Sequence, residues 1–519
     1  MNRRSFLRNA AVLAGSTGAI TWPVVTPAWA AQPASRRYVA THFASPTGAG
    51  AHNGTRGNEW TLAEAYANAG AGSRVQFAPG TYVAQSGPNR TAAFTPHNNG
   101  TAANPIVFFA EHPAVYHQNG SQLHTTWLSD FKVHGLGSVT GHAERAQGGR
   151  YVVWDGISMR QVNGAWNSGE LGVVSLFAGG SLHVKFLRCL FDQQGQGQLD
   201  PQNNWGAVFI QQTTAIEFAD CAFKNIPGSR GDENAMPIVT YATGELEIHH
   251  CEFRNNSGGS VFLKGVQARS SHDNRPVRLH HCLHTGYSSL SIGFGAVGQG
   301  NLQEGQFCDV FQNVFHPAAD GLGLSIWWRD VSGGQAPRNV RMANNTLVGP
   351  VPFEGGEEAL HRLTTITDAD DIWRDSLFMN NLVQHEGSNV AYIGVQYGKN
   401  TPAAFRRMRS DYNCFASGFR SYAGMDLGAW QSLGQDTRTF FGNPRLRDPK
   451  IADFRLDARS PVRATGSNPG IDVLNLHGTG AAAKINMGAY ITADMSDTIG
   501  IRPETTTASL PLVWAWPYA

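Results

Sequence analysis

The sequence predicts an all-β fold, a parallel β-helix in which short strands stack coil upon coil, and three observations support this. A short phrase of similar residues returns about every 31 residues through the middle of the chain. Within each phrase apolar residues alternate with polar ones, as in a strand, and helical periodicity is absent. Glycine is abundant, at 59 of 519 residues, as expected for many short strands and turns. Repetition with a fixed period of this size indicates a solenoid.

The repeated phrase runs from 184 to 415 and keeps one position for cysteine or asparagine. Its first three copies read "VKFLRCLF" (184–191), "IEFADCAF" (216–223) and "LEIHHCEF" (246–253). One strand per copy, stacked about 4.8 Å from its counterpart in the preceding copy, gives a parallel β-helix. The sixth position of successive copies is Cys189, Cys221, Cys251, Cys282, Asn313, Asn345, Asn381 and Asn413.

This sixth position predicts an internal file of like side chains at one corner of the coils. Unpaired cysteine is among the most buried residue types, and asparagine can hydrogen-bond to its own kind from coil to coil. Two alternatives stay open for the thiols, because neighbouring rungs are close enough for disulfides and cysteine also binds metals. The sequence has no C-x-x-C motif, so packing is the preferred interpretation.

The segments on either side of the repeat resemble known proteins. "ATHFASPTGAGAHNGTRGNEWTLAEAYANAGAGSRVQFAPGTYV" (40–83) has Thr61 and Glu64 at the spacing of a helix capping box, and "FRLDARSPVRATGSNPGIDV" (454–473) precedes "NMGAYI" (486–491). With the repeat, they resemble right-handed parallel β-helix proteins of the pectate-lyase-like superfamily over roughly residues 38–491. The resemblance implies a single-stranded right-handed solenoid of about ten coils with an N-terminal helix cap. This scaffold carries lyases, hydrolases, epimerases and adhesins, so it does not select an activity.

The start of the chain predicts export. Residues 1–30 contain Arg3 and Arg4 in "NRRSFL", then an apolar stretch and the small-x-small sequence "AWA" (28–30). The paired arginines resemble the twin-arginine consensus, which implies a signal peptide and export of the folded protein to the periplasm or beyond; an ordinary secretory signal is the alternative. The β-helix domain is expected at 31–495 and a C-terminal tail at 496–519. No later run is apolar enough to predict a membrane span.

A second set of strands, upstream of the repeated phrase, predicts a candidate site. The segments "AVFIQ" (207–211), "PIVTY" (237–241), "VFLKG" (261–265), "LSIGF" (290–294), "LSIWW" (324–328) and "LTTIT" (363–367) align with an apolar inward column. On the outer surface, three successive coils then carry a lysine, a glycine and a tryptophan. This arrangement predicts a notch with a cation on one side and an aromatic wall on the other, and the aromatic ring could stack on a sugar ring. The outward column is Gln211, Thr240, Lys264, Gly293, Trp327 and Thr367.

Candidate roles follow from a resemblance to the chondroitinase-B and alginate-lyase group of β-helix enzymes. That group uses a lysine base and an arginine that stabilises the charge developing on a uronate carboxylate. The resemblance implies Lys264 as the base and Arg329 as the neutralising group, with Arg269 on the loop 266–276 as a second arginine. Here Lys264 and Arg329 are expected two coils apart, whereas that group takes the two residues from neighbouring coils. Substrate-binding positions are assigned to Trp327, Gln211, Trp328 and Asp330.

The leading functional prediction is an exported polysaccharide lyase that cleaves a uronate-containing glycan by β-elimination. Its expected partner is a polysaccharide or oligosaccharide, and the chain is expected to be a monomer. One alternative is a glycoside hydrolase with two carboxylates among Asp320, Asp330 and Asp368, and another is a non-catalytic glycan-binding envelope protein. Loop carboxylates leave Ca²⁺ open as a cofactor, and no residue is assigned to a metal. With a net charge of +1, the chain gives no reason to expect nucleic acid.

Histidines and an aspartate form a polar column at the corner beside the internal file. His249 and His280 share the fourth position of the phrase. Exposed imidazoles beside a carboxylate can hold a metal or relay protons. A polar corner is the preferred interpretation, because later copies carry amides at the fifth position, which reads Asp220, His250, His281, Gln312 and Asn344 in successive copies.

Overall fold

The structure is a computed structural model of the chain. The predicted signal peptide at 1–30 lies outside the described residues, as does most of the predicted tail at 496–519. The described residues are 38–83, 98–111, 115–116, 122–123, 126–129, 150–160, 172–192, 206–226, 236–243, 245–256, 259–266, 277–286, 288–294, 308–317, 324–330, 339–351, 353–354, 357–364, 375–395, 404–471, 485–492 and 498–502.

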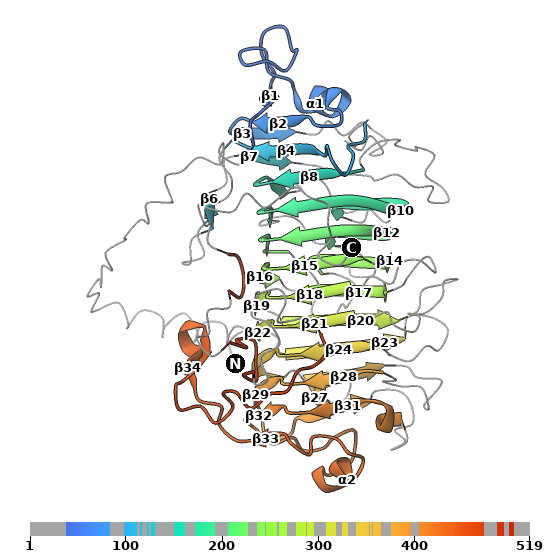
Figure 1. Cartoon of the computed structure of the whole chain (residues 1–519), viewed down its shortest axis with the longest axis vertical. Helices are drawn as coiled ribbons and strands as arrows, with labels where there is room; N and C mark the ends of the chain where they lie inside the picture. The colour runs from blue at the N-terminus through green and yellow to red at the C-terminus, as the bar shows by residue number, and fades with distance from the viewer. Residues whose placement is uncertain are drawn as a thin grey trace, which may run out of the picture.

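Parallel strands stacked coil upon coil build an elongated molecule (Figure 1). Each strand pairs with its counterpart one coil further along, as Ile248 does with Leu279, and Leu279 with Val310. Strand β12 (Gly206–Ala219) bends from one face to the next, pairing with β14 (Ile238–Thr243) through its first half and β15 (Leu246–His249) through its second. The predicted fold, a right-handed parallel β-helix, is confirmed.

The strands lie on three faces, with two faces joined in one nineteen-stranded sheet. The first face contains β10 (Gly172–Leu187), β12, β14, β17 (Val261–Val266), β20 (Ser288–Phe294), β23 (Leu324–Asp330), β27 (Glu357–Thr364) and β30 (Ala391–Val395). The second contains β1 (His42–Ala44), β2 (Arg74–Phe77), β4 (Ile106–Ala110), β8 (Val152–Asp155), the ends of β10 and β12, β15, β18 (Val277–His280), β21 (Cys308–Phe311), β24 (Val340–Ala343), β28 (Leu377–Met379) and β31 (Arg409–Asp411).

The third face is a separate sheet. It contains β3 (Gly80–Val83), β7 (Thr126–Ser129), β9 (Ser158–Arg160), β11 (Leu190–Asp192), β13 (Ala222–Lys224), β16 (Glu252–Asn256), β19 (Leu283–Gly286), β22 (Val314–His316), β25 (Thr346–Pro350), β29 (Leu382–Glu386), β32 (Cys414–Phe415) and β33 (Phe440–Phe441). Shorter elements are β5 (Val115–Tyr116), β6 (Gln122–Leu123), β26 (Phe353–Glu354), β34 (Leu446–Asp448), β35 (Asp453–Leu456), α1 (Leu62–Asn68), α2 (Leu427–Ser432), η4 (Ala404–Arg407) and η5 (Pro449–Ile451).

The number of coils differs from the predicted figure of about ten. The sheet on the third face has twelve strands, ordered along the chain from β3 to β33. The repeated phrase starts only at 184, so it does not include the early rungs made by β3, β7 and β9. Those rungs lack the cysteine or asparagine of the file, which is why the phrase does not reveal them.

The N-terminal end of the solenoid is closed by helix α1, as predicted. Thr61 accepts a hydrogen bond from the Glu64 backbone, and the Glu64 side chain accepts one from the Thr61 backbone, which completes the capping box. Tyr66 of this helix packs edge-on against Phe108 and Trp154 at ring-centroid distances of 5.4 and 5.8 Å. The helix thereby shields the first rungs of the core from water. Among the described residues no helix is long and apolar enough to cross a membrane.

Like side chains stack on one another through the core. Phe191, Phe223 and Phe253 lie nearly parallel, with ring centroids 4.7 and 4.9 Å apart. His284 and then Phe315 continue this aromatic file at 4.7 and 4.3 Å, and all five side chains are fully buried. Parallel in-register strands place equivalent positions above one another, so each inner ring of the file has a stacked neighbour on both sides.

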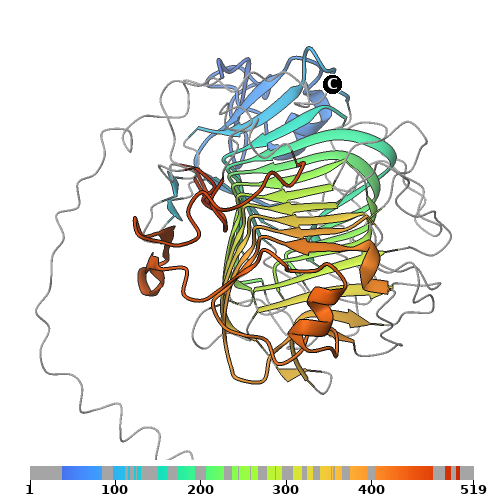
Figure 2. The same cartoon turned by 60° about the horizontal axis from the view of Figure 1, so that its bottom comes forward.

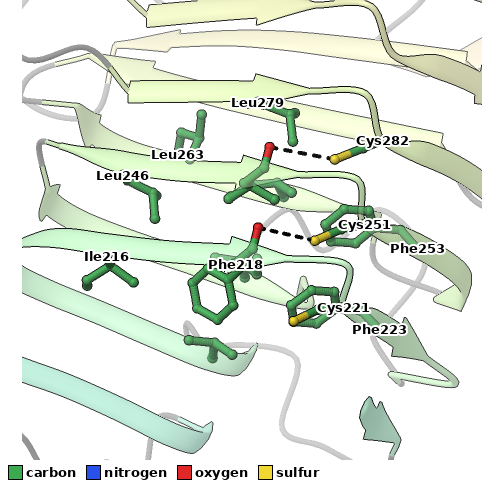
Figure 3. Packing of buried hydrophobic residues seen from close by; sticks show 14 of the residues in the cluster. Ile216, Phe218, Cys221, Phe223, Leu246, Cys251, Phe253, Leu263, Leu279 and Cys282 are labelled. Carbon is green, nitrogen blue, oxygen red and sulfur yellow. Dashed lines mark hydrogen bonds between the residues drawn. The ribbon is translucent and has the colours of Figure 1, made fainter. Parts of the chain in front are cut away.

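The predicted internal file is confirmed, and all six cysteines are buried and free (Figure 3). Its thiol half, defined as Cys189, Cys221, Cys251 and Cys282, is at most 1% exposed. Its amide half is defined as Asn313, Asn345, Asn381 and Asn413. Each thiol donates a hydrogen bond to a carbonyl oxygen of the preceding coil, such as Cys221 to Phe186 at 3.2 Å. The packing interpretation therefore holds, and the disulfide alternative is wrong.

A C-terminal strap runs along the corner between the second and third faces (Figure 2). We define it as residues 466–471, 485–492 and 498–502. The corner residues beneath it have left-handed backbones, with φ between 51° and 57°, a conformation in which asparagine, aspartate and histidine are over-represented. Amide side chains hold the strap there, because Gln312 and Asn344 donate to the carbonyl oxygens of Ala489 and Asn486 at 3.2 and 3.0 Å. These corner residues are Asp220, His250, His281, Gln312, Asn344 and Asn380.

Candidate active face

The first face carries the predicted lysine and arginine in one register row. Lys264 pairs with Gly293 one coil on, and Gly293 pairs with Arg329 in the next coil. Two steps of about 4.8 Å separate the lysine and arginine rungs by about 10 Å, with a glycine between them. The row follows directly on a row that contains the fully buried Leu263. The row contains Phe177, Gln211, Tyr241, Lys264, Gly293, Arg329 and Thr364.

The register differs from the predicted alignment in the coil of β14. Tyr241, not Thr240, pairs with both Gln211 and Lys264. Thr240 pairs with Leu263 instead and is buried to 1% exposure. The segment "PIVTY" has two adjacent apolar residues, so its alternation allows either of them to face the core. The observed backbone pairing differs from the predicted register by one residue. A shift of one residue turns the inward side chains of a strand outward and the outward ones inward.

The tryptophan pair is also placed differently from the prediction. "LSIGF" and "LSIWW" align by eye on their first leucines, but Leu290 pairs with Ile326, two residues further along. Arg329 therefore takes the position beside Gly293 that the sequence assigns to Trp327. Trp327 pairs with Ser291 in the neighbouring row, and Trp328 pairs with Ile292, in the row of the buried Leu263. A period of two leaves a shift of two residues invisible in the apolar pattern.

Other residues predicted for the site lie at its edge or outside the described residues. Asp330 ends β23 and pairs with Phe294. Arg269, the second candidate arginine, lies outside the described residues, and so do the carboxylates Asp320 and Asp368 of the hydrolase alternative. The final segment, "LTTIT", is displaced as well. Strand β27 ends at Thr364, and Ile366 and Thr367 lie outside the described residues.

Strand β27 of the first face holds a buried charged residue that the predicted set of segments misses. Arg362 of β27 pairs with Trp327 and is only 3% exposed. It lies two residues before Thr364, which belongs to the lysine and arginine row. The alternation of Ala359, His361 and Leu363 in "EALHRL" could have predicted this strand. It indicates a strand that begins before the segment "LTTIT".

The histidine column is a second polar cluster. His280 and His281 are 2% and 0% exposed. The Nδ1 atoms of His280 and His281 lie 2.8 Å apart, and those of His249 and His250 lie 3.0 Å apart. The rings also stack between coils, at 5.1 Å for His249 on His280 and 4.8 Å for His250 on His281. His280 and His281 are thus buried, whereas His249 and His250 remain partly exposed, and the column is the polar corner that the sequence favours.

Two glutamates on the second face complete the cluster. Glu217 accepts from His249 Nε2 at 3.2 Å and pairs with Lys185 at 2.6 Å, while Glu247 contacts His280 Nε2 at 3.1 Å. Burial by itself raises the pKa of Glu217, but the hydrogen bond from His249 and the charge of Lys185 outweigh it and lower that pKa to about 2. Burial raises the pKa of Glu247. Burial lowers the pKa of His249, yet the two glutamates outweigh it and raise this pKa overall.

The two clusters differ in the chemistry they can perform. The side chains of the histidine cluster are engaged in hydrogen bonds and ion pairs with one another. No group of three or more His, Cys, Asp or Glu side chains suited to a metal ion occurs among the described residues. The row of Lys264 and Arg329 combines a residue type that can remove a proton with one that can stabilise a carboxylate. The first face is therefore the better candidate site.

The comparisons with known proteins concern the fold. No protein-family model matches the chain, and no curated protein matches it in sequence. The chain is similar in structure to pectate lyase Pel9A, with 13% identity, 86% of this chain and 95% of that chain covered, and a TM-score of 0.46. The PL6 family polysaccharide lyase Pedsa3628 from Pseudopedobacter saltans is 12% identical over 74% and 90% of the two chains, with a TM-score of 0.37. The GH136 lacto-N-biosidase from Eubacterium ramulus is 10% identical over 77% and 67%, with a TM-score of 0.33.

Proposed function

We propose that the protein is a carbohydrate-active enzyme, a polysaccharide lyase that cleaves a uronate-containing glycan by β-elimination on its first face. The observation that supports this is the register row in which Lys264 and Arg329 flank Gly293. A glycine between two cationic residues leaves the backbone free of a side chain, which allows a ligand to approach it closely. Trp327 lies two residues before Arg329 in the same strand and is the proposed platform for a sugar ring.

The proposed reaction needs a base and a group that stabilises negative charge. The neutral amine of Lys264 removes the proton from carbon 5 of the uronate, next to its carboxylate. Charge then spreads into the carboxylate, where the guanidinium of Arg329 stabilises it. The electron pair forms the double bond between carbons 4 and 5 as the bond from carbon 4 to the glycosidic oxygen breaks. The lysine ammonium returns its proton to that leaving oxygen.

A panel of acidic polysaccharides tests the proposal. The lyase product carries an unsaturated uronate, whose ultraviolet absorbance should rise as the glycan is cut. Lys264→Ala should lower kcat/KM by about 10²-fold or more, since general-base catalysis contributes about 10² to 10⁴-fold. Lys450→Ala, an exposed lysine of η5, is the matched control and should leave the rate unchanged.

Three outcomes contradict the proposal in different ways. New reducing ends without the absorbance select a glycoside hydrolase. Binding of a glycan without either signal selects a non-catalytic binding protein. A full rate in the Lys264→Ala variant removes this lysine from the mechanism while leaving the lyase reaction itself standing.

We also propose export through the twin-arginine route to the periplasm or the medium, on the strength of Arg3 and Arg4 in residues 1–30. Replacing both arginines by lysine keeps the charge and removes the twin-arginine pattern. The doubly substituted protein should accumulate in the cytoplasm, as fractionation of producing cells would detect. Unchanged export would indicate an ordinary secretory signal.

A further inference from the structure

The last part of the strap, residues 498–502, is attached at two neighbouring corners of the solenoid. The backbone N–H of Gly500 donates to the carbonyl oxygen of His281 at 2.8 Å. Arg502 binds Asp220 through three contacts: its backbone N–H at 3.1 Å, Nε at 2.9 Å and Nη2 at 2.5 Å. His250 occupies the corner between these two attachment points, because Asp220, His250 and His281 are equivalent residues of successive coils.

This attachment places the guanidinium of Arg502 at the corner next to a stacked imidazole pair, in which His281 is fully buried and His250 is partly buried. His250 stacks on His281 at 4.8 Å, and each imidazole is hydrogen-bonded through Nδ1 to its preceding histidine. The Arg502 side chain is 34% exposed, while the Asp220 side chain that it grips is 11% exposed. A proton added to His250 would therefore place two like charges close together in a poorly solvated site.

The remaining charged groups around the imidazoles are already paired. Glu217 pairs with Lys185, and Glu247 contacts His280. On the flanking corner towards the N-terminus, Arg188 pairs with Asp155, and on the other side the corner residue is the uncharged Gln312. Within 498–502 the single charged side chain is Arg502. Asp220, the acid at the equivalent corner of the preceding coil, is already bound by Arg502.

We propose that residues 498–502 form a pH-sensitive latch, closed while the stacked pair His250 and His281 is uncharged and released when the pair takes up protons in acid. Release separates Arg502 from Asp220 and Gly500 from His281. The attachment of residues 498–502 therefore depends on pH, whereas the attachment of the rest of the strap does not. Ser467, Asn486 and Ala489 are held by the amide side chains of Asn380, Asn344 and Gln312, which do not titrate.

The direction of the pH effect follows from linkage. Burial lowers the pKa of His250 well below its ordinary value, and the charges of His281 and Arg502 lower it further. A histidine whose pKa is lowered in the closed state stabilises that state above its ordinary value of about 6.5. Below that pH the open state binds more protons, and closure weakens by about tenfold per pH unit for each proton taken up.

Hydrogen exchange on the full-length protein tests the latch. The protection of the Gly500 amide, corrected for the intrinsic exchange rate at each pH, should fall by about tenfold or more between pH 7 and pH 5. The Gly488 amide is the internal control, because it donates to the Asn380 carbonyl oxygen at 2.7 Å on the amide-held part of the strap. Its protection should stay unchanged over the same range.

Asparagine variants identify the groups responsible. Asn344 and Asn380 occupy the equivalent corners with the same left-handed backbone, so His250→Asn with His281→Asn should fold. In that variant the Gly500 amide should stay protected at pH 5. Arg502→Gln removes the guanidinium and should lower protection at pH 7 while flattening its pH dependence. Protection of Gly500 that does not change with pH, or a pH dependence that persists in the asparagine variant, would overturn the proposal.

Discussion

The thiol half and the amide half of the internal file occupy the same position in successive coils, yet they join the coils differently. In both halves the side chain donates to a carbonyl oxygen of the preceding coil, as Cys251 does to Phe218 at 3.5 Å and Asn345 to Val310 at 2.9 Å. The amide is also a strong acceptor. The Oδ1 of Asn345 takes hydrogen bonds from the backbone N–H and the side chain of Asn313, at 3.0 and 3.1 Å.

The difference shows how one corner can be built from packing or from hydrogen bonds. A thiol is a weak donor and behaves mainly as a small apolar group, so the thiol half depends on tight packing. An amide has two donors and an acceptor, and each one reaches the backbone or an amide of an adjacent coil. The amide half is therefore a continuous hydrogen-bonded chain, in which removing one member leaves partners on both sides without a bond.

The largest expected effect is that of Asn345→Ala. The substitution deprives the Asn313 N–H and the Val310 carbonyl oxygen of their bonds and buries both in the core. Each buried polar group left unsatisfied costs about 1 to 3 kcal/mol, so the free energy of unfolding should fall by about 4 kcal/mol. Denaturant titration followed by circular dichroism measures the change.

Asn345→Cys sharpens the same comparison, because it copies the thiol half into the amide half. The thiol can still donate towards Val310 but is only a weak acceptor for Asn313, so the stability of the variant should lie between those of the wild type and Asn345→Ala. If the cysteine variant were as stable as the wild type, the hydrogen bonds accepted by the Oδ1 atom of Asn345 would contribute nothing to the free energy of unfolding.

The boundary between the two halves carries an acid-sensitive residue. His284 lies in the coil of Cys282, between Phe253 and Phe315, and burial lowers its pKa to about 3. Its neutral form stabilises the fold fully above pH 6.5, and this contribution is lost as the pH falls from 6.5 towards 3. Between pH 6.5 and pH 5 the loss is about 2 kcal/mol. His284→Phe, which continues the aromatic file, should be spared that loss when unfolding is measured at both pH values.

The control for the aromatic file is His52→Asn, at an exposed position with a left-handed backbone. It should lose stability in acid as the wild type does. If His284→Phe lost as much as the wild type between the two pH values, the neutral state of His284 would not be the source of acid sensitivity.

A smaller effect is expected from Cys251→Ala. The substitution removes one buried sulfur atom and a weak hydrogen-bond donor. It does not interrupt a chain of strong hydrogen bonds. The free energy of unfolding should fall by about 1 kcal/mol, in the range of a small cavity. A loss as large as that of Asn345→Ala would contradict the distinction between packing and hydrogen bonding.

The smallest effect is expected from thiol reagents on the native protein. All six cysteines are buried, so a water-soluble reagent should label none of them before denaturation and all six afterwards. Mass spectrometry counts the labels. Fewer than six labels after denaturation without reductant would indicate disulfides between neighbouring rungs.

Much of the fold is predictable from the sequence because stacking repeats its own pattern. Cys189 through Asn413 recur at nearly constant spacing, and this recurrence predicts both the solenoid and the internal file. The candidate face is less predictable. "PIVTY" allows two registers and "LSIWW" allows a shift of two, so alternation alone misplaces Thr240 and Trp327. Arg362 is missed because its strand begins before the segment chosen for the alignment.

By itself the sequence determined the coil repeat, the capping box of α1 and the chemical identity of each file, since these depend on neighbours along the chain and on a fixed period. Only the tertiary structure decided the register of Lys264, Gly293 and Arg329 and the attachment of residues 498–502 at the corners of Asp220 and His281. The physical reason is that register is chosen by backbone hydrogen bonds between coils, and the strap reaches its corner from hundreds of residues away. Neither interaction leaves a periodic mark in the amino-acid pattern.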